Sequence, residues 1–374
     1  MLTLESPIEM QRPPIVRFGA GQVATLAPWL AATGARRPFV VADKVNAARL
    51  DILGLEGATL FGGVKPEPDL PNLEDAVEAA REAEADAVVG FGGGSAMDLA
   101  KLVAVLVTSG KRLADISGPG RAPGRVVRLA QVPTTAGTGS EVGTRALITD
   151  PETLNKVATE SVEMLADIAI IDPALTVSVP PMVTAATGVD AMAHCVEAFT
   201  SKRAHPVIDA YALQGIELVG RYLARAVEDG TDIEARAGLA LAAFYGGVCL
   251  GPVNTTAGHA VAYPLGTRHK LAHGIANALI FPHTLAANAP AEPEKTALVG
   301  RALGFDAQAR QQVLGGARDF CQRLGLDMAL RAHGVPQDDL PASAKEAHAI
   351  RRLLDWNPVD LSEADILEIY EAAY

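Results

Sequence analysis

Residues 87–101, AVVGFGGGSAMDLAK, contain the pattern that decides the fold. The first five predict a buried strand, and the glycines that follow predict a tight turn into a helix over 96–107. Glycine lets the backbone approach a ligand closely, and the free N–H groups of a helix N-terminus favour an anion. The segment therefore predicts a pyrophosphate site at Gly93, Gly94 and Ser95, although a tight turn without a ligand has the same pattern.

Strands and helices alternate on both sides of this segment. Residues 38–42 (PFVVA), 126–132 and 168–171 have the apolar, β-branched composition of strands, and 73–85 has helical spacing with many Ala and Glu residues. Strands separated by helices of this length indicate βαβ units. We therefore expect an N-terminal α/β domain with a parallel sheet.

The pattern changes at the Pro-Pro pair at 180–181. Proline is disfavoured inside helices and constrains the residue before it, so the pair is a plausible domain boundary. Beyond it the apolar residues recur with helical periodicity at 184–200, 206–226, 233–249, 307–324 and 363–373. We expect an α/β domain over 1–180, an all-helical domain over 181–374, and a ligand site in the cleft between them.

Composition excludes several classes of protein. Of the 374 residues, 49% are hydrophobic and 20% are charged, which argues against disorder and coiled coil. The net charge of −12 argues against nucleic acid or an anionic membrane as the main partner. The longest apolar runs, such as 102–107, are far shorter than the roughly 20 residues of a membrane helix. With no visible secretory signal and three scattered cysteines, we expect a cytoplasmic protein.

A second glycine-rich loop, VPTTAGTGSEV at 132–142, follows a predicted strand. Its hydroxyl side chains, Thr134, Thr135, Thr138 and Ser140, are candidates to donate hydrogen bonds to ribose or phosphate oxygens. The alternative is a hydroxyl-rich helix cap, a common role of serine and threonine.

Two aspartates add to the predicted nucleotide site. Asp43 ends the strand at 38–42, where a carboxylate accepts hydrogen bonds from ribose hydroxyls and repels a 2′-phosphate. Aspartates at strand ends also begin turns, so Asp43 by itself is only weak evidence for a ribose-binding site. Asp98 is expected in the first helical turn after the glycines, where the helix dipole alone favours a carboxylate.

A metal site is predicted from four residues in the second half. Asp190 and His194 are four apart on a predicted helix and therefore share one face. His259 and His273 lie fourteen apart, with a proline and a glycine between them, so we expect His259 to end one helix and His273 to begin another. One carboxylate and three imidazoles suit Fe²⁺ or Zn²⁺. The alternative is that each histidine is an ordinary hydrogen-bonded residue.

These segments, in this order, resemble the iron-containing (group III) alcohol dehydrogenase family. The resemblance covers nearly the whole chain, and its motifs together are highly specific. They are FGGGSAMDLAK (91–101), QVPTTAGTGSEV (131–142), AIIDPALT (169–176), GVDAMAHCVEA (188–198), HAVAYPLGTRHKLAHGIANALIFPH (259–283) and NPVDLSEADI (357–366).

The resemblance implies a Rossmann-like NAD(P)-binding domain, a helical metal-binding domain of dehydroquinate synthase-like architecture, and a homodimer. It also implies reversible hydride transfer between a nicotinamide and a small alcohol, aldehyde or ketone whose oxygen is bound to Fe²⁺, or Zn²⁺ as the alternative. An acid at Asp43 implies NAD rather than NADP. The cofactor residues implied are Asp43, Gly93, Gly94, Ser95, Asp98, Thr134, Thr135, Thr138, Ser140 and Lys156. The metal ligands implied are Asp190, His194, His259 and His273.

The sequence departs from the family at two positions. Many members have a histidine four residues after the third metal ligand, near the nicotinamide, where a proton relay is assigned. This chain has Tyr263 there, so Tyr263, beside His273, is the candidate catalytic residue. The family's SEVT segment ends here in Gly143, which removes one possible hydroxyl contact to the cofactor.

Two other functions stay open at this point. Maleylacetate reductases share the architecture but lack an aspartate at the position of Asp190. Dehydroquinate synthase, a lyase of related fold, needs a basic phosphate-binding pocket, for which Arg268 and Lys270 are the only nearby cations in the metal segment.

Overall fold

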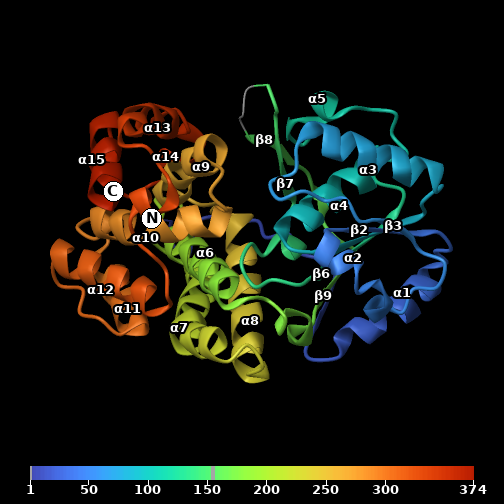
Figure 1. Ribbon diagram of the computed structural model, residues 1–374, viewed down its shortest axis with the longest axis horizontal. Coiled ribbons are helices and arrows are strands. Elements are labelled where there is room, and N and C mark those ends of the chain that lie inside the picture. Colours follow the sequence, from blue (N-terminus) through green and yellow to red (C-terminus); the bar gives the residue numbers. More distant parts are fainter. Residues whose placement is uncertain (1, 153–155) are drawn as a thin grey trace. The chain divides into compact units, whose positions relative to one another are not determined.

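The structure, a computed structural model, describes residues 2–152 and 156–374 and forms two compact units (Figure 1). The α/β unit contains residues 11–135 and 139–177. The helical unit contains 178–374 together with two short segments, 136–138 and the N-terminal residues up to 10. We propose a domain boundary at 180–181.

A parallel sheet forms the centre of the α/β unit, with strand order β1-β9-β6-β4-β2-β3. Strands β2, β4 and β9 are buried along their whole length, which explains their continuous apolar runs, since parallel sheets are covered on both faces. The strands are β1 (Ile15–Phe18), β2 (Pro38–Ala42), β3 (Thr59–Phe61), β4 (Ala87–Gly92), β6 (Arg128–Pro133) and β9 (Ile168–Ile171).

Helices cover both faces of this sheet. Phe39 and Val41 of β2 belong to one apolar cluster with residues of α3 and α4, whereas Val40 and Ala42 belong to another with residues of α1. This alternation follows from the two-residue period of a strand. The helices are α1 (Leu26–Thr33), α2 (Lys44–Ala47), α3 (Leu70–Glu82), α4 (Gly94–Leu106) and α5 (Leu113–Ile116). Short 3₁₀ turns lie at Gln22–Thr25, Leu50–Leu53, Ser140–Val142, Val162–Met164 and Pro173–Thr176.

A small second sheet was not predicted from the sequence. Its strands, in the order β5-β8-β7, are β5 (Gly118–Pro119), β8 (Lys156–Glu160) and β7 (Arg145–Thr149). Strands β7 and β8 pair antiparallel, and Arg145 contacts Glu160 across them at 2.7 Å. These strands are half-buried and carry charged residues, so they lack the apolar run that marks the central strands.

The predicted elements agree with the structure apart from their ends. The strands predicted at 38–42 and 168–171 coincide with β2 and β9. Helix α4 begins at Gly94, two residues earlier than expected, because the glycines themselves adopt the first turn. Asp98 is therefore the fifth residue of α4 and lies outside its first turn, which corrects the sequence-based placement.

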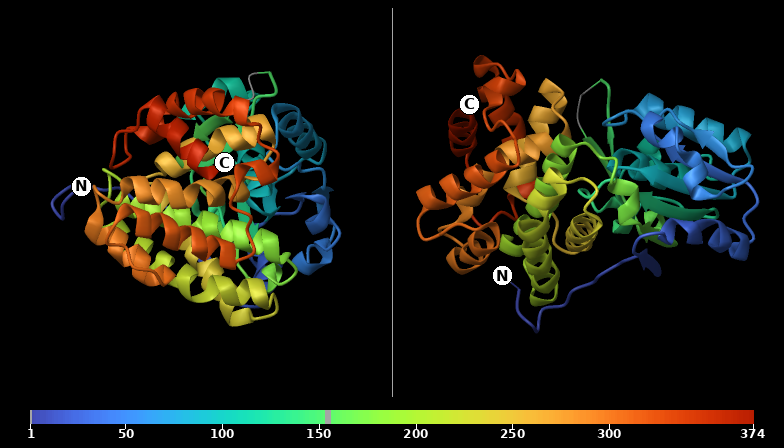
Figure 2. Two further views of the ribbon diagram at one scale, coloured as in Figure 1. Left: turned by 60° about the vertical axis from the view of Figure 1, so that its left-hand side comes forward. Right: turned by 60° about the horizontal axis from the view of Figure 1, so that its bottom comes forward.

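Helix α6 (Pro181–Thr200) packs against α7, α8 and α10 in the helical unit, whose helices are drawn from green to red in Figure 2. Helices α7, α8 and α10 contribute residues to the same apolar cluster as α6. The other helices are α7 (Pro206–Glu228), α8 (Ile233–Leu250), α9 (Ala257–His269), α10 (His273–Asn288), α11 (Pro293–Leu303), α12 (Arg310–Arg323), α13 (Leu340–His348), α14 (Arg351–Leu354) and α15 (Glu363–Ala373), with 3₁₀ turns at Leu330–His333 and Gln337–Asp339. The predicted fold class, a parallel α/β part followed by an all-helical part, is confirmed.

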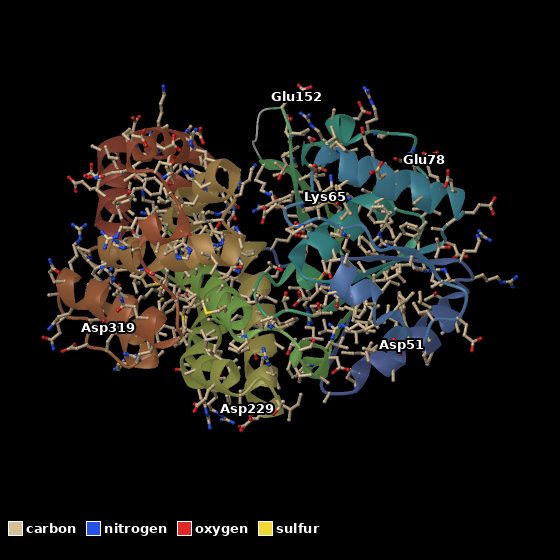
Figure 3. All side chains as sticks on the ribbon, in the orientation of Figure 1. Asp51, Lys65, Glu78, Glu152, Asp229 and Asp319 are labelled. Carbon is tan, nitrogen blue, oxygen red and sulfur yellow. The ribbon has the colours of Figure 1, made fainter. Side chains whose placement is uncertain are left out.

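Among the described helices, only α8 is long and apolar enough to cross a membrane. Most of α8 is buried, and it packs against α6 and α7. Those are the features of a core helix. The charged side chains of Asp51, Glu78, Asp229 and Asp319, labelled in Figure 3, lie on the outside of their units.

Helix α9 corrects one expectation. His259 is the third residue of α9 and does not end a helix, whereas His273 does begin α10 as expected. Pro264 lies inside α9, which continues to His269 and ends where Lys270 adopts a left-handed conformation (φ 62°). A proline inside a helix removes one hydrogen bond and its ring crowds the carbonyl one turn earlier, and the buried apolar face of α9 compensates for this cost.

Two helical glycines provide a test of the packing. A Cβ on Gly220 of α7 would lie 2.1 Å from the carbonyl oxygen of Ala302 in α11, whereas a Cβ on Gly315 of α12 would meet nothing within 4 Å. We expect Gly220→Ala to lower the free energy of unfolding by about 1–3 kcal/mol. Gly315→Ala should raise it by up to about 1 kcal/mol, because alanine is the better helix former. Urea unfolding measures both, and equal effects would contradict the close packing of α7 on α11.

Candidate metal centre and nucleotide-binding loops

The four predicted metal ligands converge in the helical unit. Asp190 and His194 lie one turn apart on α6, His259 lies in α9, and His273 begins α10. From Oδ1 of Asp190, the Nε2 atoms of His259 and His273 are each 3.6 Å away, and that of His194 is 4.0 Å away. One donor atom from each side chain lies within 4.8 Å of the others.

This donor set fits a divalent transition metal. Ligands at about 2.1 Å from a tetrahedral ion are roughly 3.4 Å apart, close to the distances from Asp190 to the imidazoles. Imidazole and carboxylate donors suit Fe²⁺ and Zn²⁺ alike. Asp190, His194 and His259 are buried, whereas the side chain of His273 is 28% exposed. His273 therefore marks the side of the centre that a small molecule can reach.

Asn277 is a further member of the centre that was not predicted from the sequence. It lies one turn after His273, and its Nδ2 donates to Oδ1 of Asp190 at 2.6 Å. The same nitrogen is 3.2 Å from Nε2 of His259 and 3.1 Å from Nε2 of His273. Among the residues that the structure describes, Oδ1 of Asn277 has no hydrogen-bond partner. The amide thus faces the point on which the ligand atoms converge.

Glu197 is the second residue that sequence reasoning missed. Its Oε1 is 2.6 Å from Nδ1 of His259, on the opposite side of the ring from Asp190. Its Oε2 accepts from the backbone N–H groups of Thr256 and His259 at 2.6 and 3.3 Å. Helical spacing could have indicated both residues. Glu197 follows His194 by three positions and Asn277 follows His273 by four, so each lies on the same helix face as a predicted ligand.

Charge interactions in this buried cluster shift several pKa values. Burial alone would raise the pKa of Asp190, but the imidazoles of His194, His273 and His259 outweigh it and hold that pKa well below its usual range. Burial lowers the pKa of His194 to about 4, which favours a neutral imidazole. Burial alone would lower the pKa of His259, but the carboxylates of Glu197 and Asp190 outweigh burial and raise this pKa well above its usual value.

Tyr263 lies beside two of the ligands. Its ring centroid is 6.0 Å from that of His273 and 6.3 Å from that of His259. The guanidinium carbon of Arg352 lies over the Tyr263 ring, 5.7 Å from its centroid. The structure thus brings the candidate catalytic tyrosine close to the most exposed ligand.

In the α/β unit, several predicted cofactor residues gather at the carboxyl ends of β2, β4 and β6. Asp43 follows β2, and its Oδ1 accepts from the N–H groups of Val45 and Asn46 at the start of α2. A Cβ on Gly92 would lie 3.2 Å from Oδ2 of Asp43, so the backbone passes close to this carboxylate. This edge of a parallel sheet is where ligands bind in open α/β folds.

The glycine turn and the threonine loop are adjacent. Gly93 precedes α4, whose first residues are Gly94 and Ser95. The N–H of Thr134 donates to the carbonyl of Gly92 at 3.0 Å, and a Cβ on Gly93 would lie 3.3 Å from Oγ1 of Thr135. These contacts place hydroxyl groups beside the N-terminus of α4, where the helix dipole favours an anion.

Asp98 and Ser140 are joined by hydrogen bonds to each other and to a buried lysine. The hydroxyl of Ser140 donates to Oδ1 of Asp98 at 2.5 Å, and Nζ of Lys101 donates to Ser140 and to the carbonyl of Arg145. Oδ2 of Asp98 accepts from the N–H of Leu147. Burial lowers the pKa of Lys101, partly offset by Asp98. This network fastens the threonine loop to α4.

The last two predicted cofactor residues lie elsewhere. Thr138 belongs to the 136–138 segment of the helical unit, where Gly137 packs against Thr187. Lys156 begins β8, where its Nζ pairs with Glu67 and donates to Oγ1 of Thr149 at 2.8 Å.

Comparisons with known proteins cover nearly the whole chain. The family model described as iron-containing alcohol dehydrogenase matches residues 13–173, and that of the Fe-containing alcohol dehydrogenase family, C-terminal, matches 184–374. The chain is 38% identical to long-chain-alcohol dehydrogenase 1 of Geobacillus thermodenitrificans (strain NG80-2), across 97% of this chain and 95% of that protein.

Two solved structures are also similar. One is a 1,3-propanediol oxidoreductase, with a TM-score of 0.93 and 30% identity, covering 99% of this chain and 100% of the other. The second is sulfoacetaldehyde reductase from Bifidobacterium kashiwanohense in complex with NAD⁺, with a TM-score of 0.88 and 28% identity, covering 98% and 99% of the two chains.

Proposed function

This chain belongs to the iron-containing alcohol dehydrogenase family, and we propose that it is a metal-dependent, NAD-linked enzyme that interconverts small alcohols with aldehydes or ketones. Its membership makes it an oxidoreductase that acts on CH–OH groups. The observation that carries the metal dependence is the convergence of Asp190, His194, His259 and His273 around one point.

The proposed metal is Fe²⁺, with Zn²⁺ as the alternative because the same donors bind both. When bound, either ion supplies Lewis-acid stabilisation of negative charge on the substrate oxygen. The chain's own part is to hold one carboxylate and three imidazoles in place, with Asn277 donating to Asp190. The partly exposed side of His273 is where we propose that the substrate enters, with Tyr263 as the group that orients it or passes a proton.

NAD is proposed to bind along the carboxyl edge of the parallel sheet. Gly93, Gly94 and Ser95 would hold the pyrophosphate, Thr134 and Thr135 would donate to it or to ribose, and Asp43 would accept from the adenosine ribose. The NAD⁺ complex of the similar sulfoacetaldehyde reductase supports this choice. Asp98 and Ser140 would act by holding the loop through Lys101. For Thr138 and Lys156, cofactor contact rests on the resemblance.

The remaining proposals concern setting and assembly. We propose a cytoplasmic homodimer that acts on small molecules, without a nucleic-acid or membrane partner. Light scattering tests the assembly, and a mass near that of one chain would contradict it.

Removal of the carboxylate ligand tests the metal-dependent reaction. Asp190→Asn keeps the side-chain shape but loses the charge that binds the cation. We expect bound iron to be lost, and NADH-dependent reduction of a panel of short aldehydes to fall by more than about 100-fold. Metal content by mass spectrometry and NADH oxidation are measured on anaerobically Fe²⁺-loaded protein. The control Asp209→Asn alters a carboxylate that pairs with Lys295 and should retain both properties. Full activity without metal would favour a metal-independent reductase of the maleylacetate type.

Replacement of Asp43 tests the nucleotide preference. Asp43→Ser keeps a side chain able to cap α2, so the fold should be retained. It removes the charge that repels a 2′-phosphate, and we expect the ratio of kcat/KM for NADH to that for NADPH to fall at least about tenfold. The control Asp86→Ser removes a carboxylate that accepts from the N–H groups of Arg36 and Arg37, and should leave the ratio unchanged. An unaltered ratio in Asp43→Ser would contradict ribose recognition by Asp43.

Replacement of Tyr263 separates proton relay from packing. Tyr263→Phe removes only the hydroxyl, and we expect kcat to fall about 100-fold with little change in KM. Steady-state kinetics across pH 6–10 provide the measurement. Tyr211→Phe, whose ring packs on Tyr245, is the matched control. If kcat stays within about twofold, Tyr263 has no role in proton transfer.

A further inference from the structure

Glu197 occupies an unusual place beside the metal centre. It lies on α6 seven residues after Asp190, about two helical turns along the same face, and is 5% exposed. A buried carboxylate is costly unless its oxygens are hydrogen-bonded or paired. Both oxygens of Glu197 meet this requirement, and each has a distinct set of partners.

Oε1 of Glu197 determines which nitrogen of His259 carries the proton. An ionised carboxylate can only accept, so at 2.6 Å it pairs with a protonated Nδ1. In the neutral ring, Nε2 then has the free lone pair, and that nitrogen faces Oδ1 of Asp190 at 3.6 Å. His194 differs, since its Nδ1 has no hydrogen-bond partner among the residues that the structure describes. His259 is thus a ligand whose orientation is set by a second carboxylate.

Oε2 of Glu197 fastens the start of the helix that carries His259. It accepts from the N–H and the hydroxyl of Thr256 and from the N–H of His259. The N–H of Ala257 goes instead to Oδ1 of Asn357, at 3.4 Å. A Cβ on Gly258 would lie 2.6 Å from Oε1 of Glu197, so only glycine lets the helix approach this closely. An anion at this end is also favoured by the helix dipole.

The charges of the two carboxylates match those of a divalent cation. Asp190 and Glu197 are two buried carboxylates, and because metal ligation requires neutral imidazoles, only these carboxylates would contribute negative charge around a bound cation. With Asp190 alone, a bound divalent cation would leave one uncompensated positive charge, which is unfavourable away from water. Glu197 supplies the missing charge without being within reach of the convergence point itself.

We propose that Glu197 is a positioning residue that fixes the ring orientation and the Nδ1-protonated tautomer of His259 and balances the charge of the bound cation. This inference rests on the metal centre proposed above. Partners of this kind, behind a histidine ligand, typically contribute 10- to 100-fold in metal affinity.

Glu197→Gln is the variant that tests the tautomer. A glutamine has one accepting and one donating terminal atom, so it cannot accept from both Nδ1 of His259 and the N–H groups of Thr256 and His259. If its amide nitrogen faces Nδ1, the ring must adopt the opposite tautomer, and Nε2 loses its lone pair. We expect Co²⁺ affinity to fall 10- to 100-fold and the visible bands of bound Co²⁺ to change in position and intensity.

Asn357→Ala is the matched control. The substitution removes the side chain that accepts a hydrogen bond from the N–H of Ala257 at the start of α9, but it leaves the partners of His259 unchanged. We expect lower stability to urea with Co²⁺ affinity within about twofold of the parent and an unchanged spectrum. Affinities come from competition with a chromophoric chelator, and circular dichroism of the metal-free proteins shows whether each variant is folded.

A measurement on the unsubstituted protein covers the case in which Glu197→Gln does not fold. With ¹⁵N-labelled histidine and Zn²⁺ bound, long-range ¹H–¹⁵N spectra should identify His259 as the Nδ1-protonated tautomer, with His259→Gln used to assign its signals. The opposite tautomer would overturn the inference.

The outcomes separate the two proposals. Failure of the unsubstituted protein to bind Co²⁺ or Zn²⁺ would refute the metal centre itself. Normal Co²⁺ binding by folded Glu197→Gln would overturn only the role of Glu197. An equal loss of affinity in Asn357→Ala would also overturn that role, since the effect would then come from the helix start.

Discussion

The burial of the Asp190 carboxylate is the constraint around which the helical unit is organised. A charge this deeply buried is stable only with close partners, and those partners come from three separate helices: α6, α9 and α10. Helix α6 must therefore run through the core, and α9 and α10 must present His259, His273 and Asn277 to the same point. The apolar packing of α7 and α8 on α6 supplies the free energy that holds this polar cluster away from water.

Glu197 extends the same constraint to the start of α9, where Asn357 of the C-terminal segment also accepts a hydrogen bond. The N–H groups of Thr256, Ala257 and His259 are bound by side chains from α6 and from the segment after α14. Unsatisfied N–H groups at a buried helix start are costly, so these acceptors stabilise the start of α9. Asn357 also exchanges hydrogen bonds with Asn288 of α10. Asn288 is the last residue of α10, so this contact lies at the opposite end of that helix from His273.

In the α/β unit, two of the polar residues predicted to contact a cofactor instead hold the loops together. The sequence predicts that Asp98 and Ser140 contact a ligand, but in the structure they form hydrogen bonds with each other and with Lys101. A carboxylate or hydroxyl gives the same local pattern whether it binds a phosphate, caps a helix or joins two loops. Only the three-dimensional neighbours of Asp98 distinguish these roles. Leu147 is far from Asp98 in the sequence, and Lys101, three positions after it, belongs to no pattern that predicts a contact with Ser140.

Local patterns by themselves predicted the parallel sheet, the change to helices and the four candidate metal ligands that the structure brings together. These predictions rest on patterns among residues that are close together in the sequence. They are the periodicity of the strands, the glycine turns and the four-residue spacing of Asp190 and His194. Tertiary structure alone decided the continuation of α9 through Pro264, the small β5-β8-β7 sheet, and the places of Asn277 and Glu197. The physical reason is that the places of Asn277 and Glu197 depend on contacts between residues dozens of positions apart, such as Glu197 with His259. The continuation of α9 depends on buried apolar area that compensates for a lost hydrogen bond.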